Sequence, residues 1–264
     1  MPTIVALVKH VPDTWSTKTL SAEHRLEREA VDNVIDEINE FSVEQALRLR
    51  EAHPDAGYQV IALTMGPARA DEALRKALAM GADDAVHVVD DALVGADALS
   101  TAWTLSAALE QVAQRFGEIA VVTMGNQASD SQTGLLAGLL AEYRQWPALT
   151  GVKSVELDGA VVRGVREDAH GVWNLEAATP ALVSVTDKAD KPRFPNFKGL
   201  MAAKKHEVTT LAVADLGIEA IAPTTQVTTS QPLPPRSAGA VISGVSAQDA
   251  ARQIADFLAD RNLI

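Results

Sequence analysis

The residues best suited to chemistry lie in the stretch TMGNQASDSQTG, residues 123–134, which follows a short apolar run. We expect residues 132–134 to begin a helix, whose free backbone N–H groups and positive dipole end suit a phosphate. Asp130 and Asn126 could hydrogen-bond a ribose or a base. The alternative is that Asp130 or Ser131 simply caps the helix. The residues alone leave both interpretations open.

A second turn of the same kind reads TMGP at residues 64–67 and follows the apolar run YQVIALT. Two such turns at neighbouring strand ends could hold one ligand from both sides. The alternative is a plain turn from a strand into a helix. Taken alone, the four residues do not decide between the two.

Motifs for other chemistries are missing from the sequence. It contains no GxxxxGK[ST], no GxGxxG after a strand, no HExxH and no GxSxG. The six histidines have no metal-ligand spacing. We therefore assign no catalytic residue and no metal site, and the missing motifs count against a hydrolase or a kinase.

Composition limits the classes of protein that remain. The chain has 264 residues, 47% hydrophobic content, a net charge of -12 and no cysteine. It can bury a sizeable core, its charge makes nucleic acid an unsuitable partner, and it cannot form disulfides. No apolar stretch approaches the roughly 20 residues of a membrane-spanning helix. We expect a soluble cytoplasmic protein that is not embedded in a membrane.

Strands and helices alternate through the first half. TIVALV, YQVIALT, DAVHVV and EIAVVT are short, nearly continuous apolar runs, typical of strands covered on both faces of a parallel sheet. Helical patterns cover residues 41–50, 67–80 and 96–116. This alternation predicts a doubly wound, mostly parallel α/β sheet, which binds ligands at the carboxyl ends of its strands.

The pattern changes after Pro147. Asp158 and Gly159 separate two alternating segments and predict a β-hairpin. Residues 222–237 are rich in Pro, Thr and Ser and predict an extended arm, and residues 246–263 predict a helix that docks on a partner subunit. We expect one domain at 1–220, with the arm and helix at 221–264.

Several long segments occur in the order found in one known family. VALVKHVPDT, INEFSVEQALRLRE, MGPARADEALRKALAMGADDAVHV, GNQASDSQTG, PALVSV and KPRFPNFKGLMAAKK together resemble the β subunit of electron transfer flavoproteins. The resemblance covers about residues 3 to 217. It implies an adenine-nucleotide α-hydrolase-like, Rossmann-type fold in a non-catalytic electron carrier subunit.

The resemblance also implies cofactors and partners. A larger α subunit would supply most of the FAD site, and the heterodimer would carry electrons from acyl-CoA and other flavin dehydrogenases, as in fatty acid β-oxidation, to a membrane quinone reductase. This subunit would bind a structural AMP. The AMP contacts carried over are Leu7, Val8, Asn39, Glu40, Phe41, Ser42, Met65, Asn126, Gln127, Asp130, Ser131, Gln132, Thr133 and Gly134, and the residues expected near the FAD are Asp13, Thr14 and Trp15.

The chain departs from the family pattern in the phosphate loop. Only Ser131 separates Asp130 from Gln132, so the loop is shorter than in many members. Glu40 stands where a proline is frequent, and its carboxylate would disfavour a phosphate unless it faces the ribose, the base or solvent.

The expected docking loop lacks the family's Leu or Ile anchor. At the matching position in TDKADKPRF this chain has Ala189, so docking should depend more on Lys188, Lys191 and Arg193. With Lys198, Lys204 and Lys205, these residues concentrate positive charge in an acidic chain; the alternative is a solvated face.

Two other functions remain open. A bifurcating flavoprotein subunit would hold its own FAD where AMP is expected. An adenine-nucleotide-binding enzyme of the same fold should show a glycine-rich phosphate motif or a catalytic acid at a strand end, and neither is evident.

Overall fold

The structure, a computed structural model, describes residues 1–234 and 239–264. These residues form two compact units, Met1–Val227 and Thr228–Ile264. The end of the expected arm, residues 235–237, lies outside the described residues. The domain boundary expected at residues 220 and 221 stays a prediction.

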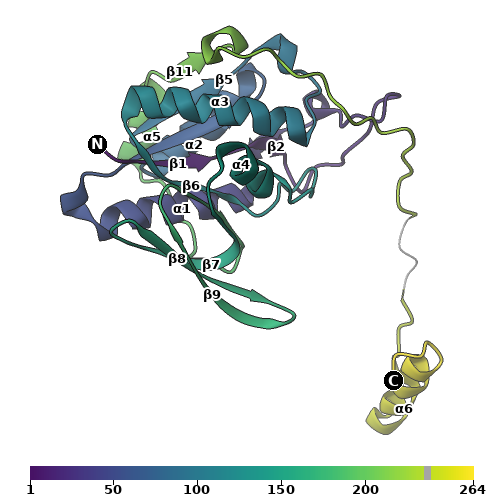
Figure 1. Ribbon diagram of the computed structural model, residues 1–264. Coiled ribbons are helices and arrows are strands. Elements are labelled where there is room, and N and C mark those ends of the chain that lie inside the picture. The colour runs from purple at the N-terminus through teal and green to yellow at the C-terminus, as the bar shows by residue number, and fades with distance from the viewer. Residues whose placement is uncertain (235–238) are drawn as a thin grey trace. The chain divides into compact units, whose positions relative to one another are not determined.

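The first unit is built on a mixed sheet, most of whose strands are labelled in Figure 1. The strand order is β11-β5-β4-β1-β6-β10-β7-β8-β9. Its mutually parallel strands are β1 (Thr3–Leu7), β4 (Gln59–Met65), β5 (Asp84–Val88), β6 (Ile119–Gly125), β7 (Ala148–Asp158), β10 (Ala181–Val185) and β11 (Thr209–Leu211). β8 (Val161–Asp168) and β9 (Gly171–Ala178) are antiparallel, and β2 (His10–Pro12) pairs separately with β3 (Asn33–Ile35). The strand order reverses about β1, between β4 and β6, which creates the switch point where such sheets bind ligands.

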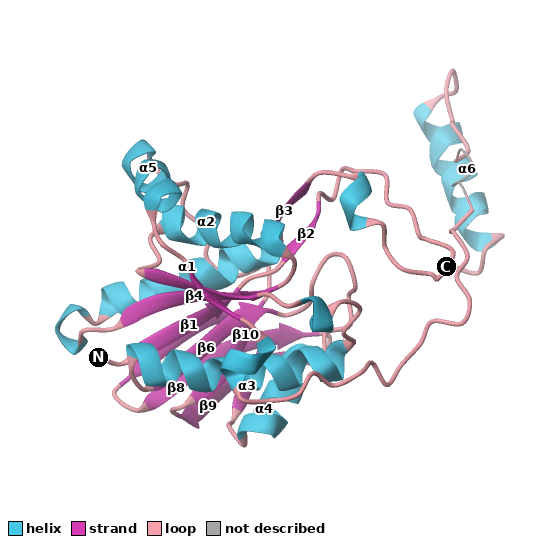
Figure 2. Ribbon diagram, turned by 90° about the horizontal axis from the view of Figure 1, so that it is seen from above, coloured by secondary structure: helices cyan, strands magenta, loops and turns pink. Residues whose placement is uncertain are grey.

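Helices cover both faces of this sheet (Figure 2). One face carries α1 (Glu37–Ala52), α2 (Asp71–Met80) and α5 (Phe197–Lys205); the other carries α3 (Ala98–Phe116) and α4 (Leu136–Arg144). Single-turn 3₁₀ helices occur at Arg28–Ala30, Pro54–Ala56, Ala68–Ala70, Asp91–Leu93 and Val213–Leu216. The doubly wound, mostly parallel α/β fold predicted from the sequence is confirmed.

Alternate residues of β1 enter opposite layers of the core. Ile4 and Ala6 belong to the apolar cluster that contains Leu47 of α1, whereas Val5 and Leu7 belong to the cluster that contains Leu109 of α3. Successive side chains of a strand point to opposite faces, so a strand covered on both sides must be apolar throughout. This explains the uninterrupted run TIVAL.

The predicted hairpin is also present. β7 ends at Asp158, β8 begins at Val161, and Gly159 between them has a positive φ of 59°. A left-handed conformation of this kind favours glycine, because a β-carbon would be strained there.

The second unit contains helix α6 (Ala247–Ala259), which begins one residue later than expected. The Ser246 hydroxyl accepts a hydrogen bond from the Asp249 N–H (3.1 Å) and caps the helix. Residues 222–234 contain neither helix nor strand. Among the described residues, we find no helix with the length and apolar character needed to span a bilayer.

Candidate nucleotide-binding site

Three parallel strands bring the predicted nucleotide residues to one edge of the sheet. β1 lies between β4 and β6, with Leu7 opposite Leu63 and Ala6 opposite Thr123. The Val8 N–H donates to the Leu63 carbonyl (2.9 Å). Val8, which follows β1, Met65, which ends β4, and Asn126, which follows β6, therefore lie at neighbouring strand ends.

The first turn of α1 joins this edge. The Asn39 side-chain oxygen accepts a hydrogen bond from the Lys9 N–H (2.9 Å), directly after β1. The Ser42 carbonyl accepts one from the Thr123 hydroxyl of β6 (3.0 Å). Asn39 and Ser42, which were predicted as AMP contacts, are thus fixed against two strand ends.

Gly125 allows α1 to approach β6 closely. A β-carbon at this position would lie 2.5 Å from Cγ2 of Ile38 and 3.1 Å from Nδ2 of Asn39. Any larger residue would have to displace the first turn of α1. Sequence reasoning missed this requirement, although the glycine directly after an apolar run was a usable signal.

Asp130 forms a buried ion-pair cluster. Its carboxylate is fully buried, pairs with Lys9 Nζ at 2.8 Å, and accepts a hydrogen bond from Arg28. Burial raises the pKa of Asp130, but the two cations outweigh this effect and the pKa is lowered. The alternative that Asp130 or Ser131 caps the helix is wrong, because α4 has no side-chain cap. A role for Asp130 in nucleotide binding stays a prediction.

Asp36 ties the loop that contains Ser129 to α1. Its buried carboxylate accepts a hydrogen bond from the Ser129 N–H (2.7 Å). Burial raises the pKa of Asp36 despite the bonds from Ser129. Neither Asp36 nor the pair Lys9 and Arg28 was found from the sequence, because no local pattern shows which charged residues meet across such long stretches of chain.

The helix after the loop begins later than expected. α4 starts at Leu136, so residues 132–134 precede it and do not form its first turn. Gln132 and Gly134 have positive φ values of 50° and 63°, which a right-handed helix does not allow. Gln127 and residues 131–134 form an exposed loop, in which the Gln132 N–H donates to the Ala128 carbonyl (2.8 Å).

Glu40 and Phe41 have partners that sequence reasoning did not identify. The Glu40 carboxylate lies 3.3 Å from Lys76 Nζ of α2 and forms an ion pair between the two helices. Phe41 is half-buried and packs against the apolar cluster beneath α1. Met65, at the end of β4, is half-buried and packs against the opposite cluster.

The residues predicted to lie near the FAD form an exposed turn after β2. The Asp13 carboxylate accepts a hydrogen bond from the Trp15 N–H (2.9 Å). Thr14 is exposed, and the Trp15 side chain is 93% exposed. The backbone of the turn is held by this hydrogen bond, while the indole ring of Trp15 is open to solvent.

The docking loop after β10 differs from the expectation at Ala189. Ala189 is 7% exposed and belongs to the core cluster, so it is not a weak surface anchor as we expected. Lys188 Nζ lies 3.2 Å from Glu167, while Lys191 is exposed and forms no ion pair within the described residues. The docking role of the loop stays a prediction.

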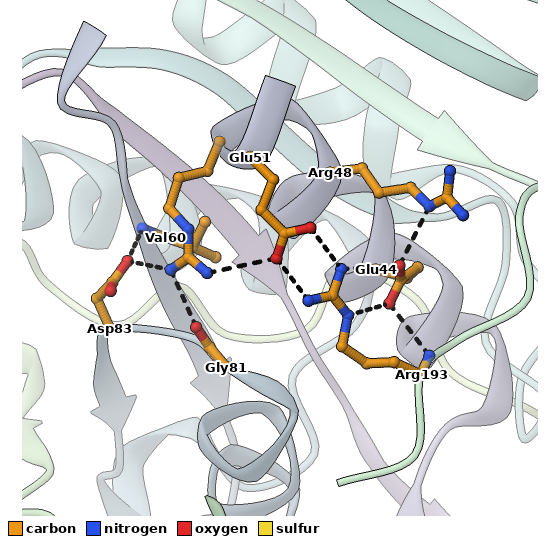
Figure 3. A network of polar contacts seen from close by, with 8 residues as sticks. Glu44, Arg48, Glu51, Val60, Gly81, Asp83 and Arg193 are labelled. Carbon is orange, nitrogen blue, oxygen red and sulfur yellow. Dashed lines mark hydrogen bonds and ion pairs between the residues drawn. The ribbon is translucent and has the colours of Figure 1, made fainter. Parts of the chain in front are cut away.

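Arg193 is held by two acids of α1 (Figure 3). Its Nε lies 2.8 Å from the Glu44 carboxylate, its backbone N–H donates to the same carboxylate (3.1 Å), and its Nη atoms bond Glu51. Burial raises the pKa of Glu44, but the bonds from Arg193 outweigh it and the pKa is lowered. The pKa of Arg193 is raised, first by Glu51 and then by Glu44.

Beyond Arg193 the chain exposes large apolar side chains. Phe194 is 93% exposed and Phe197 is 78% exposed. Leu200 and Met201, which follow Phe197 at helical spacing on α5, are also exposed. Sequence reasoning did not single out these four residues.

A hollow of about 650 Å³ lies between α1, β7 and the docking loop. Its lining includes Glu44, Arg48, Asp190 and Arg193 and none of the predicted AMP residues. It is therefore separate from the nucleotide site. Within residues 1–234 and 239–264, no group of three or more His, Asp or Glu side chains is arranged to hold a metal ion.

Comparisons with known proteins agree with this architecture. A family profile described as the electron transfer flavoprotein domain matches residues 24–216. An electron transfer flavoprotein subunit beta of Mycobacterium leprae is 43% identical over the full length of both chains. That of Thermoanaerobacterium thermosaccharolyticum is 34% identical over 99% of both, and the caffeyl-CoA reductase-Etf complex subunit CarD of Acetobacterium woodii is 31% identical over 99% of both. The chain therefore belongs to the electron transfer flavoprotein family, among its β subunits.

Proposed function

We propose that this chain pairs with an electron transfer flavoprotein α subunit, binds a structural AMP and helps enclose the FAD of the α subunit. The heterodimer carries electrons from acyl-CoA and other flavin dehydrogenases to a quinone reductase of the respiratory chain. In this role the chain is non-catalytic alone, works in the cytoplasm and serves fatty acid β-oxidation. Membership of the family and similarity to β subunits along the whole chain support this proposal.

The observation that carries the AMP proposal is the convergence of three strand ends with the first turn of α1. The exposed loop at residues 131–134 offers the backbone N–H groups of Thr133 and Gly134, whereas that of Gln132 already donates to the Ala128 carbonyl (2.8 Å); a β-carbon on Gly134 would meet nothing closer than 3.9 Å. Open space beside a glycine lets a phosphate approach the backbone. Lys9 and Arg28, each with a partly exposed side chain, add positive charge beside the loop. These groups fit a nucleoside monophosphate.

The proposed contribution of this chain to the FAD site is to cover the flavin that the α subunit holds. The exposed turn of Asp13, Thr14 and Trp15 offers an uncovered indole to a flavin held by the α subunit. When bound, the flavin accepts and releases the electrons. The residues of this chain exclude water from it and orient it.

Docking of a dehydrogenase is proposed to use the exposed residues Phe194 and Phe197. Residues 188–205 contain six basic residues and a single acidic one, Asp190, in a chain of net charge -12. Lys198, Lys204 and Lys205 form no ion pair within the described residues. Exposed apolar side chains in a lysine-rich segment suit the acidic surface of a transient partner.

Nucleotide extraction tests the proposal. The purified chain, alone and with its α subunit, is denatured in acid, and the released nucleotides are identified by mass spectrometry. We expect AMP from both samples, and FAD in stoichiometric amount only from the heterodimer. An absence of AMP from both samples would refute the AMP site, and a colourless heterodimer would refute the carrier function.

A second candidate is a bifurcating subunit with its own FAD in the AMP position. The 31% identity to a subunit of a caffeyl-CoA reductase-Etf complex supports this second candidate. It predicts FAD in the extract of the isolated chain.

A further inference from the structure

Arg193 fixes the main chain as well as its own side chain. Its backbone N–H and its guanidinium both donate to Glu44, and the guanidinium also bonds Glu51 (Figure 3). Ion pairs in which a planar guanidinium donates two hydrogen bonds to carboxylates fix the relative orientation of the paired groups. The backbone that carries Phe194, the next residue, is therefore held in a fixed position.

The chain on both sides of Arg193 is anchored too. Ala189 is buried, and Asp190 lies 3.3 Å from Arg48 of α1. After Phe194, the Asn196 side chain accepts a hydrogen bond from the Gly199 N–H (2.8 Å) and caps α5. A β-carbon on Gly199 would lie 2.6 Å from the Ala79 carbonyl, so α5 presses against the end of α2. Phe194 and Phe197 are thus exposed side chains on a rigid support.

The support extends into the sheet. Glu51 lies 3.9 Å from Arg50, whose guanidinium bonds Asp83 (2.7 Å) and the Gly81 carbonyl (3.0 Å). Asp83 in turn accepts a hydrogen bond from the Val60 N–H at the start of β4 (2.7 Å). The polar network therefore connects the docking loop, through α1, to a central strand.

We propose that Arg193 is a positioning residue, which works through Glu44 and Glu51 to hold Phe194 and Phe197 in place for a redox partner and does not itself dock by its charge. This inference rests on the proposed docking function. The Glu44 side chain is only 4% exposed, and both of its carboxylate oxygens are already bonded to Arg48 or Arg193, so it is not presented to a partner protein. Any effect of Glu44 on docking must pass through the loop.

The direction in which docking affinity changes when Glu44 is replaced distinguishes positioning of the loop from direct charge attraction. If charge alone mattered, removing an acid beside a lysine-rich surface would strengthen the attraction of an acidic partner, and removing Arg193 would weaken it. If the network positions the loop, both changes weaken docking. A loosened segment must be ordered again on binding, and this entropic cost lowers affinity.

The test uses the heterodimer with its FAD. A purified medium-chain acyl-CoA dehydrogenase and its acyl-CoA substrate reduce the flavin, and KM and kcat are measured for Glu44→Gln, Arg193→Gln and the double variant. We expect each single variant to raise KM about fivefold to tenfold, with kcat within about twofold of the parent. The double variant should be little worse than either single one, because both remove the same interaction.

Arg163→Gln is the matched control. Arg163 also pairs with two carboxylates, those of Asp158 and Glu176, but on the β7–β9 hairpins. Its loss should leave KM unchanged. If Glu44→Gln fails to fold, Glu51→Gln replaces it, because Glu51 is 47% exposed and tolerates the change; a KM increase is expected there too.

Three results would overturn the inference. The first is a KM for Glu44→Gln equal to or below that of the parent. The second is a parallel fall of kcat and flavin content, which indicates a purely structural role. In the third, a parent heterodimer that holds FAD but accepts no electrons would overturn the proposed function as well, which distinguishes the two failures.

Discussion

The ion-pair cluster at Asp130 allows a quantitative prediction. Asp130→Asn removes a fully buried carboxylate that pairs with Lys9 and Arg28. Leaving a buried charge without its partner costs about 3–5 kcal/mol. Here the remaining charges belong to side chains that are 40% and 38% exposed, so both can turn toward water. The removed carboxylate also no longer has to be desolvated.

We therefore expect Asp130→Asn to lower the free energy of unfolding by about 2 kcal/mol at pH 7. In a chain of this size that corresponds to a fall in Tm of about 4–8 °C. The pKa of Asp130 is lowered in the folded state, so its stabilisation is present above the unfolded value of about 3.9 and is lost as the pH falls through the folded pKa. The difference between parent and variant should shrink toward pH 3.

Urea denaturation from pH 7 to pH 3 measures both effects. Asp158→Asn is the control: Asp158 pairs with Arg163 at the surface, and its replacement should change stability little. Equal stability of the parent and Asp130→Asn at pH 7 would refute the reasoning. So would a difference that stays constant down to pH 3, because the carboxylate's charge would then not be its source.

Other replacements test the remaining features of the site. Asp36→Asn should stabilise the chain at pH 7, because burial raises the pKa of Asp36 and its ionised form is unfavourable in the folded state; the gain in urea midpoint should begin to shrink as the pH falls to that raised pKa and be lost below the unfolded value of about 3.9. Gly125→Ala should lower stability by about 1–3 kcal/mol and reduce the extractable AMP, because its β-carbon would clash with Ile38. Phe197→Ser should raise KM for the dehydrogenase at least tenfold, as expected for an interface hot spot, while Val172→Ser, an exposed apolar control on β9, should not. Normal AMP content in Gly125→Ala, or an unchanged KM in Phe197→Ser, would contradict these assignments.

Local chemistry was enough to predict the fold. The run TIVAL has to be a strand buried on both faces, because alternate residues enter two apolar layers. Asp158 and Gly159 predict their turn because a positive φ favours glycine. The start of α4 was misjudged, since the sequence does not reveal that Gln132 also adopts a positive φ.

The candidate site was only partly predictable. The strand-end segments that carry Val8, Met65 and Asn126 follow from the alternation of strands and helices, and the family resemblance supplied their proposed ligand. The charge partners inside the site did not follow from the sequence. Lys9 and Asp130 are 121 positions apart, and no local pattern shows which of many acids and bases become buried together.

The class of fold and the family followed from the sequence, because periodicity, turn chemistry and extended motifs are local properties of the chain; the edge of the sheet where a ligand should bind stays a prediction. Tertiary structure alone decided that Ala189 is buried, that Phe194 is exposed, and that Arg193 is held by Glu44, 149 positions away. The physical reason is that burial and ion pairing depend on which surfaces meet after folding, and those surfaces come from distant segments.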